Sequence, residues 1–253
     1  MSFAVAAEAY DRFMGRYSEP LAPQLVELAA ISNGQRVLDV GCGPGALTAE
    51  LARRLGPASV SAVDPSEPFV EAVRERYAEV EVRLAPAEDL PFAAAAFDAA
   101  LAQLVVHFMQ DPVAGLSEMA RVTRPGGIVA ASVWDHAGSQ GPLSFFWEVA
   151  RELEAEVEDE SGLPGTREGH LAELFTAAGL RDVDDAVLSM TVEHPTFEDW
   201  WEPFTLGVGP AGAYVVSLGP DRLEELRERC RERLPEPPFA LSAVAWAARG
   251  RAG

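Results

Sequence analysis

The sequence predicts an α/β protein with a doubly wound, mostly parallel sheet, an antiparallel C-terminal strand and a helical cap insertion. Short apolar runs alternate with helical patterns up to residue 134, and this rhythm loosens afterwards. Such alternation indicates βαβ units, whose right-handed crossovers place helices on both faces of a parallel sheet. A late aromatic-rich segment then separates two strand-like runs. At 253 residues, the chain is long enough to bury one large core.

The elements of the first half follow the hydrophobic periodicity. Each expected strand is a short β-prone run that ends near charged or turn-forming residues. These strands are 36–40, 59–63, 80–84, 97–101 and 128–134. The expected helices carry apolar side chains three or four positions apart and are 46–55, 66–77 and 111–122. Ser66 is expected to cap the second helix.

The second half is predicted to hold helices at 145–158 and 171–178 and an alternating strand at 183–192. One segment, 196–234, then carries the aromatic residues Trp200, Trp201, Phe204 and Tyr214 and a very charged helix. We interpret this segment as a cap, because its aromatics are too many for an exposed loop. The predicted organisation is a single domain over 1–253. Its parts are a helical N-terminal tract (1–35), a cofactor-binding core (36–134), the cap (196–234) and a final strand (239–249).

The charge balance disfavours several classes of function. Forty acidic and 20 basic residues give a formal net charge of −20, which disfavours binding to nucleic acid or to an anionic membrane. All the basic residues are arginine, so catalysis by lysine is excluded. Two cysteines are too few for a disulfide scaffold, and no signal peptide or membrane span is recognisable. We expect a cytoplasmic protein that acts on a small molecule, and its oligomeric state stays open.

The strongest functional signal is the run Val37 to Gly45, in which a strand leads into a glycine loop and then a helix. Glycines at this place let the backbone approach a ligand closely. The dinucleotide-binding pattern G-x-G-x-x-A is also met, with Asp64 about twenty residues further on. A nicotinamide enzyme is therefore one interpretation of this loop.

Two residues favour S-adenosylmethionine (SAM) over a dinucleotide. Pro44 has no amide hydrogen, so the loop offers one donor fewer to a pyrophosphate. Asp39 stands two positions before the first glycine, where its carboxylate would repel a pyrophosphate and attract an ammonium or sulfonium group. SAM carries both cations, has no phosphate, and offers a ribose diol to Asp64.

The first half of the chain resembles the class I SAM-dependent methyltransferases, in particular the small-molecule group related to quinone C-methyltransferases. The matching segments are the glycine loop at 37–45, the acidic strand end at 63–66, the adenine-side loop and fourth strand at 87–98, the helix and turn at 118–127, and the N-terminal helix at 10–17. The resemblance implies a Rossmann-like fold, SAM as the cofactor and S-adenosylhomocysteine (SAH) as the product.

The cofactor contacts expected from the motifs and from this resemblance come from eleven residues. They are Asp39, Gly41, Gly43, Gly45, Asp64, Pro65, Ala87, Glu88, Gln103, Tyr10 and Arg16. Relatives usually carry an aspartate before the Ala-Glu pair, and this chain has Pro86 there. Glu88 or a backbone carbonyl would therefore have to accept from the adenine amino group. Arg16 could pair with the SAM carboxylate or with Glu19 on its own helix.

Catalysis by a methyltransferase depends mainly on placing the acceptor behind the activated carbon. A general base is needed only where the acceptor must lose a proton. His107 and His136 follow strands at the expected site and are the candidates for this base, although a lone histidine among apolar residues is more often packed. His170 and His194 are expected at the surface. No spacing of histidine, cysteine and carboxylate residues suggests a metal site.

The acceptor is expected to be small and largely apolar or aromatic. Trp134, Trp200, Trp201 and Phe204 are the expected walls of its pocket. The sequence leaves the accepting atom (O, N or C) open. Two other functions are also open: a nicotinamide-dependent oxidoreductase, and a catalytically silent SAM-binding regulatory protein.

Overall fold

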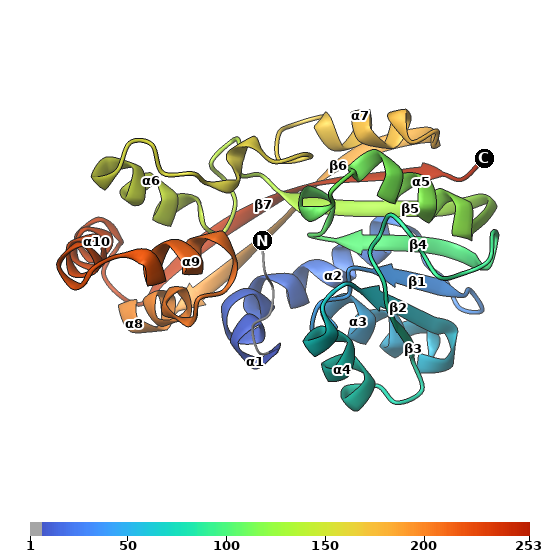
Figure 1. The fold of residues 1–253 in the computed structure, drawn as a ribbon, viewed down its shortest axis with the longest axis horizontal. Helices are drawn as coiled ribbons and strands as arrows, with labels where there is room; N and C mark the ends of the chain where they lie inside the picture. The colour runs from blue at the N-terminus through green and yellow to red at the C-terminus, as the bar shows by residue number, and fades with distance from the viewer. Residues whose placement is uncertain (1–6) are drawn as a thin grey trace.

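In the computed structural model, which describes residues 7–253, seven strands form one sheet in the order β3-β2-β1-β4-β5-β7-β6 (Figure 1). The strands are β1 (Val37–Val40), β2 (Val60–Asp64), β3 (Glu81–Leu84), β4 (Phe97–Gln103), β5 (Thr123–Trp134), β6 (Arg181–His194) and β7 (Phe239–Arg251). Neighbouring strands from β3 to β5 are parallel, and β7 is antiparallel to both β5 and β6. This confirms the predicted fold class. Residues 1–6, where the expected N-terminal tract begins, lie outside the described residues.

Helices cover both faces of the sheet. One face carries α2 (Arg16–Leu28), α3 (Ala46–Leu55) and α4 (Glu67–Arg76), and the other carries α5 (Pro112–Val122) and α7 (His170–Ala177). Each helix buries an apolar stripe, such as Leu21 and Leu25 of α2 or Leu116 and Met119 of α5. Two separate cores result, as expected for a doubly wound sheet.

Local sequence sets the helix boundaries in this half. Helix α3 begins after Gly45, whose φ of 105° only glycine adopts readily, and ends at Gly56. Helix α5 begins at Pro112, and the side chain of the preceding Asp111 accepts a hydrogen bond from the Ala114 amide at 3.0 Å. The N-terminal segment is continuous with α2: α1 (Ala7–Tyr10) leads through a π-helical turn (Asp11–Gly15) into it.

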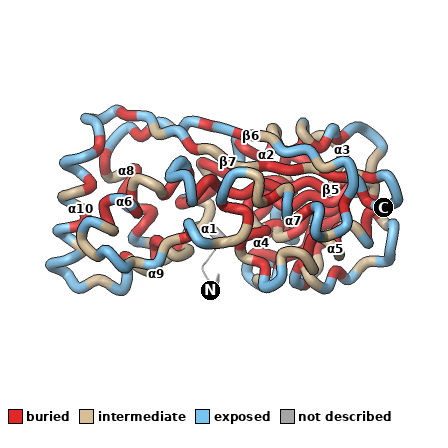
Figure 2. The backbone as a smooth tube through the Cα atoms, turned by 90° about the horizontal axis from the view of Figure 1, so that it is seen from above, coloured by how far each residue is buried: buried red, intermediate tan, exposed pale blue. Residues whose placement is uncertain are grey.

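Four helices form a lobe beside the carboxyl ends of the strands, at the left of Figure 1. They are α6 (Ser144–Leu153), α8 (Phe197–Trp201), α9 (Gly209–Ser217) and α10 (Pro220–Arg233). Three of them lie between β6 and β7, within the segment expected to form the cap, and α6 joins them from the chain after β5. We call these four helices the cap. Its buried residues belong to the same hydrophobic cluster as the core on the α2 side of the sheet. Figure 2 shows buried residues, in red, in both the sheet and the cap.

Some boundaries differ from the expected ones. Strand β5 begins at Thr123 rather than at residue 128, because Thr123 already pairs with Phe97 before the register shifts. Helix α6 ends at Leu153, and the acidic stretch up to Glu158 is not helical. Ser66 makes no side-chain cap; Asp64 accepts from its amide instead. No helix in the described part of the chain is long and apolar enough to cross a membrane.

Candidate functional site

The glycine loop connects β1 to α3 in a conformation that depends on glycine. Gly41, Gly43 and Gly45 have φ values of 71°, 52° and 105°. A methyl group added at Gly41 would lie 2.5 Å from the Val105 side chain, so β1 and the chain after β4 pack closely here. A methyl group added at Gly43 would meet no atom within 4 Å, because this part of the loop faces open space. The loop is therefore packed on one side and open on the other.

Asp64, at the end of β2, holds this loop in place. One carboxylate oxygen accepts from the Gly43 amide at 2.8 Å, and the other accepts from the Ser66 amide at 2.8 Å. The side chain is buried, and burial raises its pKa to about 6, although the two backbone hydrogen bonds lower it. A carboxylate oxygen can accept more than one hydrogen bond, so Asp64 can still bind a ligand hydroxyl.

Asp39 lies beneath the loop. The Thr48 hydroxyl donates to its Oδ2 at 2.6 Å, and its Oδ1 has no hydrogen-bond partner among the described residues. Burial raises the pKa of this carboxyl to about 7, and the nearby Asp64 carboxylate raises it further while the Thr48 hydrogen bond lowers it. Asp39 therefore contributes negative charge behind the loop rather than a surface that a ligand touches.

A cleft lies on the open side of the loop, and we call it the glycine-loop cleft. It is lined by Tyr10, Gly41, Gly43, Asp64, Pro65, Phe69, Pro86, Ala87, Glu88, Leu104, Val105, His107, Phe108, Met109 and Gln110. Seven of the eleven expected cofactor contacts are in this lining. The other four, Asp39, Gly45, Gln103 and Arg16, are not.

Glu88 also has a structural partner at the edge of this cleft. Its Oε1 accepts from the Gln110 amide at 2.8 Å and from the Asp111 amide at 3.3 Å. These bonds tie the loop after β3 to the start of α5, which brings Pro86 and Gln110 into the same wall.

Gln103 and Arg16 bind protein groups instead of facing the cleft. Gln103 donates from Nε2 to the Ser18 carbonyl at 2.9 Å and so joins the end of β4 to α2. Arg16 donates to the Asp199 carboxylate at 2.8 Å, and the Asp199 carboxylate also contacts His194 at 3.1 Å. Arg16 therefore connects the N-terminal segment to the cap and pairs with neither Glu19 nor the cleft. His194 is buried in this contact and is not at the surface as expected.

A second, smaller pocket adjoins the cleft, and we call it the inner pocket. It is lined by Tyr10, Phe13, Met14, Leu104, His107, Phe108, Trp134, His136, Leu143, Glu160, Val208, Gly209 and Pro210. Tyr10, Leu104, His107 and Phe108 line both pockets. The shared residue Leu104 has a φ of 61°, which is rare for a branched side chain and typical of functional positions.

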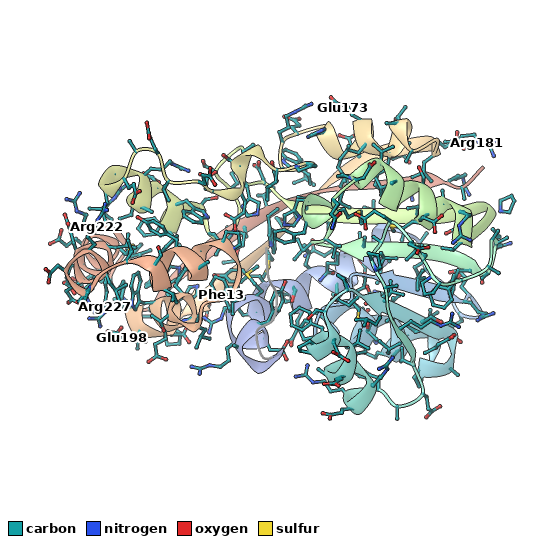
Figure 3. All side chains as sticks on the ribbon, viewed as in Figure 1. Phe13, Glu173, Arg181, Glu198, Arg222 and Arg227 are labelled. Atoms are coloured by element: carbon teal, nitrogen blue, oxygen red, sulfur yellow. The ribbon has the colours of Figure 1, made fainter. Side chains whose placement is uncertain are left out.

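Trp134 is the only one of the four expected pocket aromatics in this lining. Trp200, Trp201 and Phe204 pack inside the cap, where Phe204 stacks on Phe146 with ring centroids 4.5 Å apart. Phe204 also meets Phe13, which does line the pocket, at 5.1 Å. Figure 3 shows Phe13 at the boundary between the sheet and the cap. These cap aromatics therefore support the wall of the pocket from behind.

Both candidate histidines line the inner pocket, with ring centroids 5.9 Å apart. Burial holds the pKa of His107 well below its usual value, and the nearby His136 lowers it further. Burial likewise lowers the pKa of His136 to about 4, against the raising effect of Asp159 and Asp135. Both imidazoles are therefore neutral at pH 7, and each has one ring nitrogen able to accept a hydrogen bond.

Glu160 was not expected at the site, yet it lines the inner pocket with only 3% of its surface exposed. Burial raises the pKa of its carboxyl to about 7. Three buried polar atoms of this lining have no hydrogen-bond partner among the described residues: His107 Nδ1, Trp134 Nε1 and Glu160 Oε2. Glu160 stands in an acidic stretch that the sequence gives no reason to place near residue 107.

Metal ligands do not gather anywhere in the described part of the chain: no three histidine, cysteine or carboxylate side chains are placed to hold an ion.

Comparisons with known proteins agree with this geometry. Residues 38–131 match the family model described as a methyltransferase domain. An uncharacterized methyltransferase of Mycobacterium tuberculosis is 36% identical over 135 residues, which are 53% of this chain and 52% of that protein. The malonyl-[acyl-carrier protein] O-methyltransferase of Serratia marcescens is 33% identical over 148 residues, 56% of this chain and 57% of that protein. The chain thus spans about half the length of the curated relatives it matches.

The solved structure of a SAM-dependent methyltransferase of Thermotoga maritima has the same fold. Its TM-score is 0.57, with 97% of this chain and 99% of that chain covered at 19% sequence identity. The relation to quinone C-methyltransferases receives no support from these matches. Residues 38–131 are thus the part of the chain that is similar to methyltransferase domains, the relatives named are methyltransferases, and these likenesses point to SAM as the cofactor.

Proposed function

We propose that this protein transfers the methyl group of SAM to a small, largely apolar acceptor. SAM would occupy the glycine-loop cleft and the acceptor the inner pocket. The observation that carries the proposal is the shared wall: Tyr10, Leu104, His107 and Phe108 line both spaces. If the methyl group of SAM lies at that wall, an acceptor in the inner pocket can approach it from the side opposite the sulfur. An in-line transfer needs this alignment.

The cleft suits SAM better than a dinucleotide. Among the described residues, no arginine lines it, so a pyrophosphate would find no cationic partner. Asp64, Ala87 and Glu88 all line the cleft. Asp64 would accept from the ribose hydroxyls, and the loop around Ala87 and Glu88 would lie beside the adenine ring. Asp39, behind the loop, favours a cationic ligand through its charge. When bound, SAM supplies a methyl group on a sulfonium, and the electron pair of the broken S–C bond leaves with SAH.

His107 is the residue we propose to contact the accepting group, because its imidazole lines both pockets. As a neutral imidazole it can accept a hydrogen bond and so orient a hydroxyl or amine. Its lowered pKa makes it a weak base, so it would take a proton only from an acceptor that is already acidic. Positioning, rather than proton removal, is then its main contribution.

Calorimetry with SAM, SAH, NAD and NADP tests the cofactor. At about a hundred times its dissociation constant, SAH should stabilise the fold by roughly 2.7 kcal/mol. Gly43→Leu should abolish this binding, because the new side chain would enter the cleft. Gly34→Leu is the matched control, since Gly34 also has a positive φ and open space around it but lies in an exposed turn. Binding of NAD without binding of SAH would overturn the proposal in favour of an oxidoreductase.

Methyl transfer itself is tested by incubating the protein with SAM and a panel of apolar hydroxyl and amine compounds, and by measuring SAH and methylated product by mass spectrometry. We expect product formation that Gly43→Leu removes. SAH binding combined with no transfer to any member of a broad panel would instead support a silent SAM-binding regulatory protein.

A further inference from the structure

Glu160 is a buried carboxyl in the wall of the inner pocket, and neither the cofactor nor the transfer step proposed above uses it. Its Oε2 has no hydrogen-bond partner among the described residues. An unpaired carboxylate in such a place is costly, so the folded protein either keeps it protonated or supplies it with a partner.

The local structure fixes Glu160 at this wall. Residues Glu160–Gly162 form a single 3₁₀ turn after α6. The Asp159 side chain begins the turn by accepting from the Ser161 amide at 2.8 Å, and Arg151 of α6 pairs with the same carboxylate. The Leu163 amide then donates to the Glu160 carbonyl at 3.1 Å. These contacts close the turn. Burial raises the pKa of the Glu160 carboxyl, while its own backbone amide and the Trp147 indole lower it.

The other side chains of the pocket favour a cation. Tyr10, Phe13, Phe108 and Trp134 contribute aromatic rings to the same lining. The faces of such rings attract ammonium groups, and a carboxylate beside several rings is the usual composition of a site that binds an amine. No arginine belongs to the described lining, and both histidines are neutral, so an anion would have no cationic partner there.

We infer that the acceptor is an amine with an apolar body, whose ammonium group is held by Glu160 and the surrounding rings. This inference rests on the proposed function and names its substrate class. The ammonium group would then supply Glu160 Oε2 with a hydrogen-bond partner, which the described residues do not give it.

The ammonium group and the accepting atom would be at opposite ends of the acceptor. Glu160 and His136 line the inner pocket but not the glycine-loop cleft, whereas His107 lines both. Glu160 and His136 also line a small polar cavity behind the pocket, together with Arg151 and Asp159. Glu160 is therefore on the side away from the methyl donor. The amine would act as the anchor, and the methyl group would go to an atom near His107.

The test uses fragments in matched sets, each an amine, an alcohol and a carboxylate on the same benzyl, cyclohexyl or indolyl body. Binding to the SAH-saturated protein is measured by ligand-observed NMR for three forms: wild type, Glu160→Gln and Glu158→Gln. Glu160→Gln keeps the shape and removes the charge. Glu158→Gln removes a charge from the exposed part of the same segment and serves as the matched control.

We expect the amines to bind wild type and Glu158→Gln about tenfold more tightly than their alcohol partners, and the carboxylates to bind least. In Glu160→Gln the preference for amines should fall to less than about twofold, with SAH affinity unchanged. Equal binding of amines and alcohols, an unchanged preference in Glu160→Gln, or no amine binding at all would overturn the inference. Failure of the wild type to bind SAH would instead overturn the proposed function, so the two failures are distinguishable.

Discussion

The glycine-loop cleft and the inner pocket share four side chains but are assembled in different ways. Apart from Tyr10 of the N-terminal segment and Phe69 of α4, the cleft is built from short segments that directly follow β1, β2, β3 and β4, where parallel strands end at the same edge of the sheet. The inner pocket takes its residues from the N-terminal segment, from the loops after β4 and β5, from the turn after α6 and from the start of α9. A local motif is therefore enough to specify the cleft, whereas the pocket exists only when distant parts of the chain have met.

The polar groups of the cleft and of the inner pocket differ in whether they have hydrogen-bond partners within the protein. In the cleft, Asp64 and Glu88 accept from backbone amides close to the ligand space, so each has a structural role beside any ligand role. In the inner pocket, polar atoms such as Glu160 Oε2 and His107 Nδ1 have no protein partner among the described residues. The cleft is thus prepared by its own hydrogen bonds, and the pocket leaves groups for a ligand to satisfy.

The largest effect is expected from a substitution at Phe204, which lines neither the cleft nor the inner pocket. It should disturb the inner pocket and leave the cleft intact. Phe204→Ala removes a ring that packs on Phe146 and supports Phe13, so it should lower the free energy of unfolding by about 3–5 kcal/mol. SAH affinity of the folded protein should change less than about twofold, while amine fragments lose their site. Thermal unfolding and calorimetry check this. Phe204→Leu, which keeps most of the volume, covers the case in which the alanine variant does not fold. Loss of SAH binding in the leucine variant would show that the two spaces depend on one another.

The next effect concerns the cleft. Asp64→Ala should weaken SAH binding by roughly 1.5–3 kcal/mol, because hydrogen bonds to a charged group are lost. The structure adds a second consequence: the Gly43 and Ser66 amides lose their acceptor, so stability should fall as well. Asp64→Asn keeps one oxygen and should recover part of both losses. If calorimetry gives a normal SAH affinity for Asp64→Ala, Asp64 shapes the loop but does not bind the cofactor.

The smallest effect tests the charge beneath the loop. Burial raises the pKa of Asp39 to about 7, so the folded state binds its proton more tightly than the unfolded state does. The stability that this proton provides is complete below about pH 4 and is lost as the pH rises towards 7. Asp39→Asn carries no charge at any pH, and its Oδ1 can still accept from Thr48.

We therefore expect Asp39→Asn to be more stable than the wild type by about 1 kcal/mol or more at pH 8, and to show no such advantage at pH 4. SAM affinity should fall several-fold, because the negative charge behind the loop is gone. Unfolding curves at the two pH values check the first expectation and calorimetry the second. An equal stability difference at both pH values would mean that Asp39 ionises normally in the folded protein.

Much of the fold and of the cleft was predictable from sequence because the signals are local. An apolar run that ends in Gly41, Gly43 and Gly45 restricts the backbone within a few residues, and Asp64 follows one βα unit later. The alternation of strands and helices then determines that these loops meet at one edge of a parallel sheet. The glycine loop, the acidic strand end and the fold class all depend on contacts between neighbours in the chain or on the right-handed crossover.

Only the tertiary structure decided the inner pocket. The aromatic density of 196–234 predicted a buried segment but not which rings face a ligand, because burial in the cap and burial in a pocket select the same residue types. Trp200, Trp201 and Phe204 form the core of the cap, while Glu160 reaches the pocket from a segment with no recognisable motif. Arg16 similarly has a long side chain that many acidic partners could attract, and the position of Asp199 on the cap settles its contact. Neighbouring residues determine the local conformation of the chain. The packing of the whole molecule determines which side chains from distant segments come into contact.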